Sequence, residues 1–351
     1  SPLDAAGMST SSGNSSTEVS ALFIMSYNPA NCHWLHTFNL FPLAQLRALL
    51  YTHHGTDYKG SSPHSSISFP NRGAMSIHPL SWKASDGLNL FAIDWKPDKK
   101  VRAAVGLVHG LGEHIERYHH VAAALNEAGI AVIGFDQRGH GKSDGPRGHA
   151  PSYEQVCKDI DLLLAQVAER YPGVPCFLYG HSMGGNQSLY YGLVRKPALA
   201  GLIVTSPGLE PANPPSAATM TLGKVMSRLA PTFKMPNGLL LEGLARDPLV
   251  IEKYRTDPLV HGFISARLGM DLITSGRWVV DHAAELSLPL LLLQGSKDML
   301  VNPAMTAKFA ALAGPQITYK EYPGYYHELH NEPEKAEVIG EIATWILARV
   351  G

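Results

Sequence analysis

The sequence predicts an α/β fold, with a mostly parallel sheet, helices on both faces of that sheet and an inserted helical cap. Short apolar segments alternate with helical patterns along most of the chain, which is typical of consecutive strand–helix–strand units. Such units cover both faces of the sheet, so the strands between them are nearly continuous in apolar residues. One long interruption late in the chain contains helical patterns without strand-like runs, and it indicates the cap.

The composition restricts the protein to the globular class. Of the 351 residues, 45% are hydrophobic and 17% are charged, which excludes a disordered chain. The net charge of -1 argues against a protein that binds nucleic acid or anionic membranes mainly by charge. Three cysteines make neither a disulfide framework nor a cysteine zinc site, and they favour a reducing, cytoplasmic compartment.

Residues 1–74 differ from the rest of the chain and are interpreted as a leader or N-terminal extension. They are rich in Ser, Asn, Thr, Gly and His, and their apolar stretch Ala21–Met25 is too short for the core of a signal peptide. Residues 42–51 have the pattern of a short amphipathic helix. The ordered body begins at Met75, and residues 75–351 are predicted to form the main domain.

Strand-like segments follow in order along the body. The first two, residues 81–82 and 88–95, are joined by Asp86-Gly87, which predicts a hairpin at an antiparallel edge of the sheet. The next six are short apolar runs that end in turn residues, as buried parallel strands do. They are AAVGLVHG (103–110), AGIAVIGFD (128–136), CFLYGHS (176–182), GLIVTSP (201–207), LPLLLLQGSKD (288–298) and ITYKEYPG (317–324).

Helical patterns lie between several of these strands. The clearest begins after Ser152, which forms the pattern of a capping box with Gln155, and it ends before Pro172. The last helix is expected to begin near Pro333. The apolar face of the first of these helices carries Val156, Ile160, Leu163, Leu164 and Val167, and that of the last carries Val338, Ile339, Ile342, Trp345 and Ile346.

The interruption that predicts the cap lies between the strand ending near Pro207 and the strand starting near Leu288. It is about 80 residues long, which is too much for a loop. Helical pieces such as residues 220–235 predict a small cap at about 208–285. Residues of such a cap either shape an apolar pocket or pack on the main domain, and the sequence leaves both readings open.

The segment GHSMG at residues 180–184 fits the motif G-x-S-x-G. It follows the strand-like CFLY directly, and a helical segment begins around residues 186–190, which is the context of a nucleophile elbow. The two glycines are needed because so tight a turn has no room for side chains on either side. The turn lifts the hydroxyl of Ser182 above the sheet, and Ser182 is therefore the predicted nucleophile.

A serine is a poor nucleophile unless a base lies within hydrogen-bond reach. In α/β-hydrolases the nucleophile, the acid and the histidine follow one another in that order. Asp298 ends the segment LLLLQGSKD and His327 follows ITYKEYP, so both lie in loops after strands, at the same rim as Ser182. His327 is the predicted base and Asp298 the residue that orients it, while His330 is the competing base.

A third loop, HGLGEH at residues 109–114, follows the strand-like AAVGLV. An HG-type loop supplies one backbone N–H to an oxyanion hole, and the residue after the nucleophile supplies the second. The predicted donors are the N–H groups of Leu111 and Met183, with His109 and Gly110 in supporting positions. Each such donor contributes about 3 kcal/mol to the stabilisation of the transition state.

These motifs together resemble the monoacylglycerol lipase family of α/β-hydrolases, and they are also similar to related serine hydrolases of the lysophospholipase type. The resemblance runs from about residue 78 to the C-terminus, with all motifs in order. It implies that Ser182, Asp298 and His327 form the family's catalytic triad. It is carried by HGLGEHIERY (109–118), FDQRGHGKSDG (135–145), GHSMGG (180–185), LLLQGSKD (291–298) and the loop of His327.

The resemblance also implies a substrate and further site residues. The implied reaction is hydrolysis of a medium- or long-chain monoacylglycerol to fatty acid and glycerol, under a cap whose apolar rim meets lipid or membrane. Glu113 and Arg117 match positions near the polar end of the family's site, and they are expected to hold the oxyanion loop or the glycerol head. Mammalian members carry a small residue where this chain has Leu111, a difference that changes the shape of the pocket.

Other readings remain open beside this one. A general carboxylesterase for short acyl chains and a lysophospholipase would use the same triad, and a ligand receptor on the same fold would use none of it. The histidines of HELH at 327–330 are three residues apart, whereas the zinc motif H-E-x-x-H needs four. We therefore expect a small lipid ester as the partner, with peripheral membrane contact through the cap and with no metal, cofactor or nucleic acid.

Overall fold

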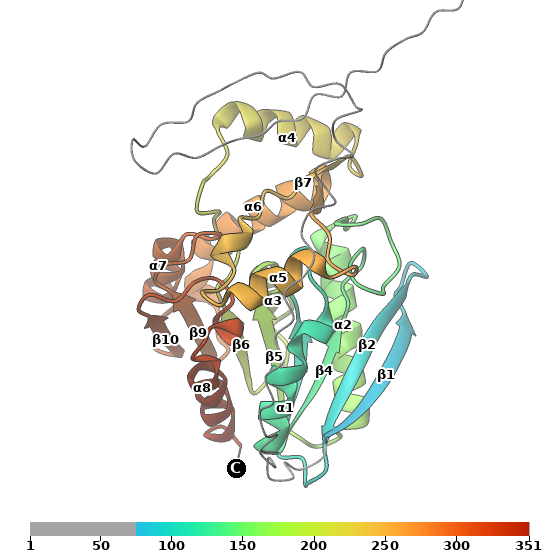
Figure 1. The fold of residues 1–351 in the computed structure, drawn as a ribbon, viewed down its shortest axis with the longest axis vertical. Helices are drawn as coiled ribbons and strands as arrows, with labels where there is room; N and C mark the ends of the chain where they lie inside the picture. Colours follow the sequence, from blue (N-terminus) through green and yellow to red (C-terminus); the bar gives the residue numbers. More distant parts are fainter. Residues whose placement is uncertain (1–74, 351) are drawn as a thin grey trace, which may run out of the picture. The chain divides into compact units, whose positions relative to one another are not determined.

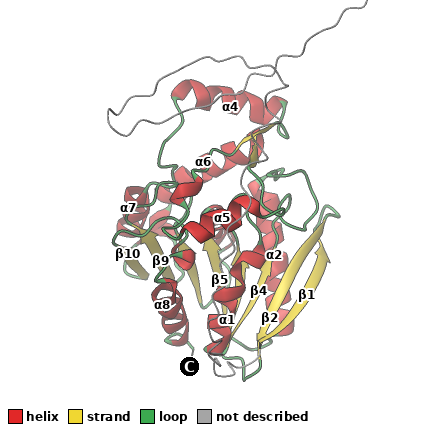
Figure 2. Ribbon diagram, viewed as in Figure 1, coloured by secondary structure: helices red, strands yellow, loops and turns green. Residues whose placement is uncertain are grey.

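The computed structural model describes residues 75–350, which form a central sheet covered by helices on both faces (Figure 1, Figure 2). The predicted leader at residues 1–74 and its expected helix at 42–51 lie outside the described residues. The α/β fold and the mostly parallel sheet are confirmed. The division of the chain into domains stays a prediction.

The central sheet has eight strands in the order β1-β2-β4-β3-β5-β6-β9-β10. The pairs β1–β2 and β2–β4 are antiparallel and the other five are parallel, so the predicted hairpin lies at an antiparallel edge. The strands are β1 (Met75–Lys83), β2 (Asn89–Pro97), β3 (Ala103–Val108), β4 (Ile130–Phe135), β5 (Cys176–His181), β6 (Gly201–Thr205), β9 (Leu290–Gly295) and β10 (Ile317–Tyr322).

Strand β1 is longer than the sequence pattern predicted, since only residues 81–82 were expected in it. Its nine residues include Pro79, which cannot donate a hydrogen bond to a neighbouring strand. An edge strand tolerates proline because one of its sides has no partner strand. Most side chains of β1 are exposed or half-buried, so the apolar alternation that marks a strand is weak here.

Helices cover both faces of this sheet (Figure 1). Three of them, α2, α3 and α7, share one apolar core with the sheet, and α1 and α8 share the other. The helices are α1 (His119–Glu127), α2 (Tyr153–Arg170), α3 (Met183–Arg195), α7 (Pro303–Ala313) and α8 (Lys335–Leu347). Two short 3-10 helices, η2 (Ile115–Tyr118) and η5 (Leu329–Asn331), precede α1 and α8.

The start of α2 forms only half of the predicted capping box. The Oγ atom of Ser152 accepts a hydrogen bond from the N–H of Gln155, at 3.1 Å, and caps the helix. The side chain of Gln155 does not return this bond. It donates instead to Ser85, which is 70 positions away in the chain, and to Asp159 on the next turn of α2.

The segment between β6 and β9 contains three helices. It also contains a small two-stranded sheet, which the sequence did not predict. Strands β7 and β8 pair antiparallel, beside the expected helical pieces. The helix expected within residues 220–235 ends at Leu229, because Pro231 follows and disfavours helical backbone before it. The elements are α4 (Ala217–Leu229), β7 (Lys234–Pro236), η3 (Leu241–Gly243), α5 (Pro248–Thr256), β8 (Phe263–Ser265), α6 (Ala266–Asp281) and η4 (Ala283–Glu285).

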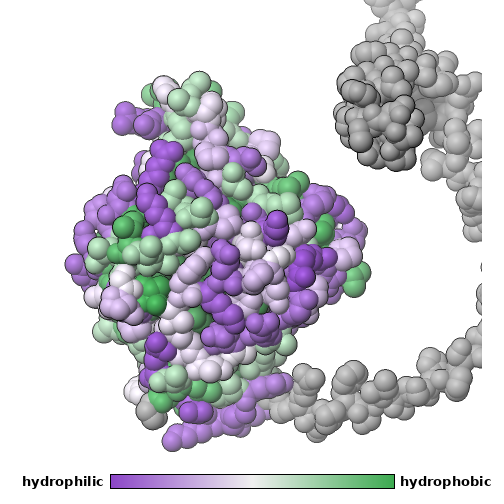
Figure 3. Space-filling model, turned by 90° about the vertical axis from the view of Figure 1, so that its left-hand side faces the viewer, coloured by the Kyte–Doolittle hydropathy of each residue, from purple (hydrophilic) through white to green (hydrophobic). Residues whose placement is uncertain are grey.

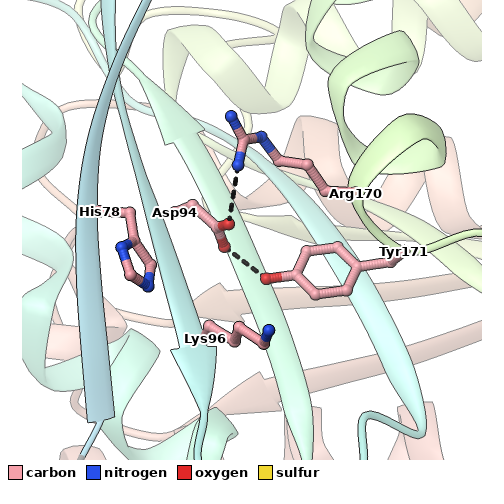
Figure 4. Close-up of a pocket in the computed structure, with 5 residues that line it drawn as sticks. All are labelled: His78, Asp94, Lys96, Arg170 and Tyr171. Atoms are coloured by element: carbon pink, nitrogen blue, oxygen red, sulfur yellow. Dashed lines mark hydrogen bonds and ion pairs between the residues drawn. The ribbon is translucent and has the colours of Figure 1, made fainter.

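No helix within residues 75–350 has both the length and the apolar content that a membrane crossing requires. A polar hollow of about 590 Å³ lies between the β1–β2 hairpin and the end of α2 (Figure 4). In it the hydroxyl of Tyr171 donates to Asp94 at 2.5 Å, and the guanidinium of Arg170 lies 3.6 Å from the same carboxylate. These contacts tie the end of α2 to β2.

Candidate active site

Ser182 lies at a sharp turn between β5 and α3, where the sequence placed it. Its backbone φ of 55° is in the left-handed region, which is costly for a residue other than glycine. A Cβ atom at Gly180 would lie 2.3 Å from the carbonyl oxygen of Gly184, and one at Gly184 would lie 2.2 Å from that of Val108. The turn therefore requires glycine on both sides of the serine, as the motif G-x-S-x-G indicates.

Ser182, His327 and Asp298 are joined by two short hydrogen bonds. Nε2 of His327 lies 2.8 Å from Oγ of Ser182, and Nδ1 of His327 lies 2.8 Å from Oδ2 of Asp298. The other oxygen of Asp298 accepts bonds from the N–H groups of Leu300 and Val301, which fixes the carboxylate. This is the arrangement in which a histidine can take a proton from serine while a carboxylate holds its orientation.

The electrostatics of the three groups suit proton transfer. Burial opposes a charge on His327, but the carboxylate of Asp298 outweighs it and raises the pKa of the imidazole above its usual 6.5. Burial also opposes the ionisation of Asp298, yet His327 and the two N–H donors keep the pKa of the carboxyl below its usual 3.8. The carboxylate is therefore ionised at neutral pH, when it can stabilise an imidazolium.

His330, the competing base, is fully buried behind this chain of hydrogen bonds. Its ring stacks on that of Tyr118, with 4.7 Å between centroids, and neither ring nitrogen has a hydrogen-bond partner among residues 75–350. Burial holds the pKa of His330 well below its usual 6.5. These observations favour His327 as the base.

The loop with the predicted oxyanion donor lies against Ser182, the predicted nucleophile. A Cβ atom at Gly110 would be 3.2 Å from Cβ of Ser182, which is tighter than most such contacts, so glycine favours this close approach. Met183 is the first residue of α3, so its N–H has no acceptor within the helix. Among the hydrogen bonds of residues 75–350, none is donated by the N–H of Leu111 or of Met183. Both groups are free to bind an oxyanion.

The supporting residues of this loop have defined partners. His109 is buried and neutral, because burial lowers the pKa of its imidazole to about 3. Its Nε2 accepts from the N–H of Gln137 at 3.0 Å, so its Nδ1 donates to the carbonyl oxygen of Gly110 at 2.7 Å. The carboxylate of Glu113 accepts from the N–H of Gly110 at 2.7 Å. These contacts favour a role for Glu113 in holding the oxyanion loop.

The structure adds one residue that the sequence analysis did not single out. Glu328 follows His327 directly, is 2% exposed, and forms a bidentate pair with Arg117. Arg117 lies on η2, 211 positions before Glu328 in the chain. No local pattern indicates such a pair. The only available signal was a glutamate next to the predicted base.

A narrow cavity opens beside Ser182 and His327, and the volume open to the centre of a water molecule in it is about 10 Å³. Leucines from the cap, from the oxyanion loop and from the loop after β9 contribute apolar side chains to its lining. Tyr254 of α5 and two glutamates contribute polar ones. Its lining includes Leu111, Leu239, Leu244, Leu300, Glu113, Tyr254 and Glu328.

The inner part of the cap is bonded to both catalytic loops. The N–H of His261 donates to the carbonyl oxygen of Gly112 at 2.9 Å, in the oxyanion loop. The N–H groups of His327 and Glu328 donate to the carbonyl oxygens of Gly243 and Leu244, at 3.3 and 2.7 Å. Helix α4, in contrast, has no buried residue.

Known proteins resemble this chain over the whole region that carries the site. The family model described as serine aminopeptidase, S33, matches residues 99–334. An uncharacterized abhydrolase domain-containing protein of Dictyostelium discoideum is 39% identical over 269 residues, which are 76% of this chain and 28% of that protein. The chain thus spans less than a third of that relative.

Two further relatives match along nearly their full length. The monoacylglycerol lipase of Mycolicibacterium smegmatis is 34% identical over 272 residues, which cover 77% of this chain and 97% of the relative. The crystal structure of the monoacylglycerol lipase of Paleococcus ferrophilus has a TM-score of 0.69 and 34% identity, and covers 74% of this chain and 99% of its own. The chain belongs to this family of α/β-hydrolases, together with the monoacylglycerol lipases.

Proposed function

We propose that the protein is a serine hydrolase that cleaves monoacylglycerols into fatty acid and glycerol. The observation that carries this proposal is the hydrogen-bonded chain from Ser182 through His327 to Asp298, beside a cavity lined by both leucines and carboxylates. Relatives named monoacylglycerol lipase support the substrate class.

The reaction proceeds in two halves. As Oγ of Ser182 bonds to the ester carbonyl carbon, its proton passes to Nε2 of His327. The N–H groups of Leu111 and Met183 stabilise the negative charge on the carbonyl oxygen. The ester C–O bond then breaks, His327 returns the proton to the glycerol oxygen, and the acyl group stays on Ser182. A water molecule, which gives a proton to His327, then attacks the acyl carbon; the bond to Oγ of Ser182 breaks, His327 returns the proton to Oγ, and the fatty acid leaves.

The charges around the cavity favour an uncharged leaving group over the phosphate of a lysophospholipid. Its lining contains no Lys or Arg, and Arg117, whose partners Glu113 and Glu328 do line it, is already paired with both. Burial opposes the ionisation of Glu328, but Arg117 outweighs it and lowers the pKa of that carboxyl. No net positive charge is left there to bind a phosphate, whereas glycerol hydroxyls can donate to carboxylates.

Peripheral contact with a lipid surface is the second part of the proposal. Helix α4 and the turn between it and β7 expose Leu222, Leu229 and Phe233, which are 62, 80 and 52% accessible. Residues 211–241 contain no acid, while Lys224, Arg228 and Lys234 are basic. Apolar and hydrophilic residues are interleaved at the end of the molecule that carries α4 (Figure 3). Such a surface binds a lipid interface through apolar burial and cationic attraction.

A second candidate is a carboxylesterase for short acyl chains, and the size of the cavity favours it. The volume open to the centre of a water molecule is only about 10 Å³, far below the roughly 300 to 1,000 Å³ of typical ligand pockets. A long acyl chain therefore requires a larger outward shift of the cap than a short chain does.

Initial rates on a chain-length series decide between these functions. Monoacylglycerols and p-nitrophenyl esters are compared in parallel, with Ser182→Ala as the control for other hydrolases in the preparation. Larger kcat/KM values for monoacylglycerols above about eight carbons, abolished in the control, are the expected result. Activity confined to acetate and butyrate esters would establish the short-chain esterase, and activity on neither series would contradict both.

A further inference from the structure

A buried ionic cluster joins the two loops that carry the predicted oxyanion donor and the catalytic base. Nη1 and Nη2 of Arg117 donate to the two carboxylate oxygens of Glu328 at 2.7 and 2.8 Å. Nη1 of Arg117 also donates to Oε2 of Glu113 at 2.5 Å. The three side chains are only 11, 3 and 3% exposed, so water does not weaken these bonds as it weakens surface pairs.

One end of this cluster holds the oxyanion loop. Oε1 of Glu113 accepts from the N–H of Gly110 at 2.7 Å and from the hydroxyl of Tyr118 at 2.8 Å. A Cβ atom at Gly110 would lie 2.8 Å from the same oxygen, so the carboxylate fills the space beside the glycine. Gly110 precedes Leu111, whose N–H is the predicted donor. A shift of the Glu113 carboxylate would therefore also shift the N–H of Leu111.

The other end holds the loop of the base. Oε2 of Glu328 also accepts from Nδ2 of Asn331 at 2.7 Å, within the same loop. The backbone N–H of Glu328 is bonded to Leu244, so both the backbone and the carboxylate of this residue are fixed. Glu328 is the neighbour of His327 along the chain. A shift of its carboxylate would move the backbone next to the imidazole.

We propose that Glu328 is a positioning residue that, through Arg117 and Glu113, keeps the N–H of Leu111 and the imidazole of His327 in place around Ser182. Glu328 is not assigned a chemical step. Donors aimed in advance at a developing charge are a large source of catalysis, and a misplacement of about 1 Å costs about a hundredfold in rate. The inference rests on the proposed ester hydrolysis at Ser182.

The test compares Glu328→Gln with a matched control, Asp159→Asn. Asp159 pairs with Arg138 in the same bidentate way, at 2.6 and 2.8 Å, with side chains 3 and 4% exposed. The control loses the charge of a buried carboxylate on α2, which is not part of the cluster. Both variants lose folding stability, so a thermal melt shows that each is folded at the assay temperature.

The main measurement is the rate at which an alkyl fluorophosphonate modifies Ser182. In this step the Oγ–P bond forms, the P–F bond breaks, fluoride leaves, and the serine proton passes to His327. We expect Glu328→Gln to slow this step by about tenfold or more, and Asp159→Asn to change it by less than about twofold. The reagent needs no knowledge of the natural ester, so failure of the proposed substrate and failure of this inference are distinguishable.

A second measurement distinguishes a misplaced oxyanion donor from a general loosening of the pocket. An alkyl trifluoromethyl ketone binds as a hemiketal oxyanion on Ser182, and we expect its affinity to fall by the same factor as the rate. A 1-O-alkylglycerol ether has no carbonyl group, so its affinity should stay within about twofold. The double variant Glu113→Gln/Glu328→Gln should lose no more than the larger single loss, because the two residues act through one guanidinium.

Three results would overturn the inference. The first is a wild-type modification rate in Glu328→Gln, and the second is an equal loss in Asp159→Asn. The third is an equal loss of affinity for the ketone and the ether, which would indicate a collapsed pocket. If Glu328→Gln is unfolded, Arg117→Lys replaces it, since lysine keeps the charge without the bidentate fork. The modification rate and the affinities for the ketone and the ether are then measured for Arg117→Lys and interpreted in the same way.

Discussion

Nε2 of His327 lies 2.8 Å from Oγ of Ser182, although the two residues are 145 positions apart in the chain. His330, only three residues further along, has no hydrogen-bond partner for either ring nitrogen within the described part of the chain. The loop after β10 thus presents one of its two histidines to the nucleophile. The difference between them can be measured.

Ser182→Ala and His327→Ala should each lower kcat by more than about a thousandfold, because the residues of a triad act as a unit. His330→Phe keeps a ring against Tyr118 and should retain turnover within about tenfold. Steady-state rates on one ester give all three values. More than about a hundredth of wild-type activity in Ser182→Ala would refute the triad, and a loss in His330→Phe equal to that in His327→Ala would favour His330 as the base.

The pH profile of kcat/KM should have an acidic limb with its midpoint above pH 6.5. Protonated His327 cannot accept the proton of Ser182, and Asp298 raises the pKa of His327 despite its burial. Glu328 adds to this effect, so Glu328→Gln should move the limb to lower pH. The nearby His181 contributes no charge, because burial lowers its pKa to about 3. A limb that moves to higher pH in the variant would contradict this assignment.

Gly184→Ala should prevent folding or abolish activity, because its Cβ would lie 2.2 Å from the carbonyl oxygen of Val108. Gly340 in α8 is the matched control, since no atom lies within 4 Å of a Cβ there. Gly340→Ala should stabilise the protein by about 0.5 to 1 kcal/mol through helix propensity. Urea unfolding and ester hydrolysis measure both variants. An active, stable Gly184→Ala protein would show that the elbow is less constrained than its geometry indicates.

The double variant Leu222→Ser/Leu229→Ser should bind phospholipid vesicles about tenfold or more weakly, because it removes two large apolar side chains from the exposed α4. Cleavage of a short soluble ester should not change, since α4 has no buried residue. Leu312→Ser, on α7, is the control with a similarly exposed leucine outside the cap. Vesicle sedimentation gives the affinity. An equal loss of vesicle affinity in the control would refute the assignment of α4 as the lipid-binding surface.

A chain that starts at Met75 should fold and hydrolyse esters with the kcat/KM of the full chain. Strand β1 begins at this residue and pairs along its length with β2, so the sheet is complete within the described residues. Thermal melting and initial rates of the two chains give the comparison. An insoluble or inactive product would show that residues 1–74 belong to the working domain.

The sequence predicted those features that depend on local patterns or on the order of motifs. The buried strands, the glycines around Ser182 and the order of serine, aspartate and histidine are of this kind. It did not predict the partner of Arg117, because that contact joins residues 211 positions apart. The side chain of Gln155 likewise left its predicted cap for Ser85, 70 residues away. Which partner such a side chain binds depends on the residues that the fold brings within its reach.

The cap consists of two parts that are constrained differently. Its inner part is bonded to the oxyanion loop through His261 and to the loop of the base through Gly243 and Leu244. We expect substitutions there to lower the rate of hydrolysis. Helix α4 has no such bonds to these two loops and no buried residue. We therefore expect its exposed side chains to tolerate exchange without loss of the reaction, so that the outer surface of the cap and the chemistry beneath it can change independently.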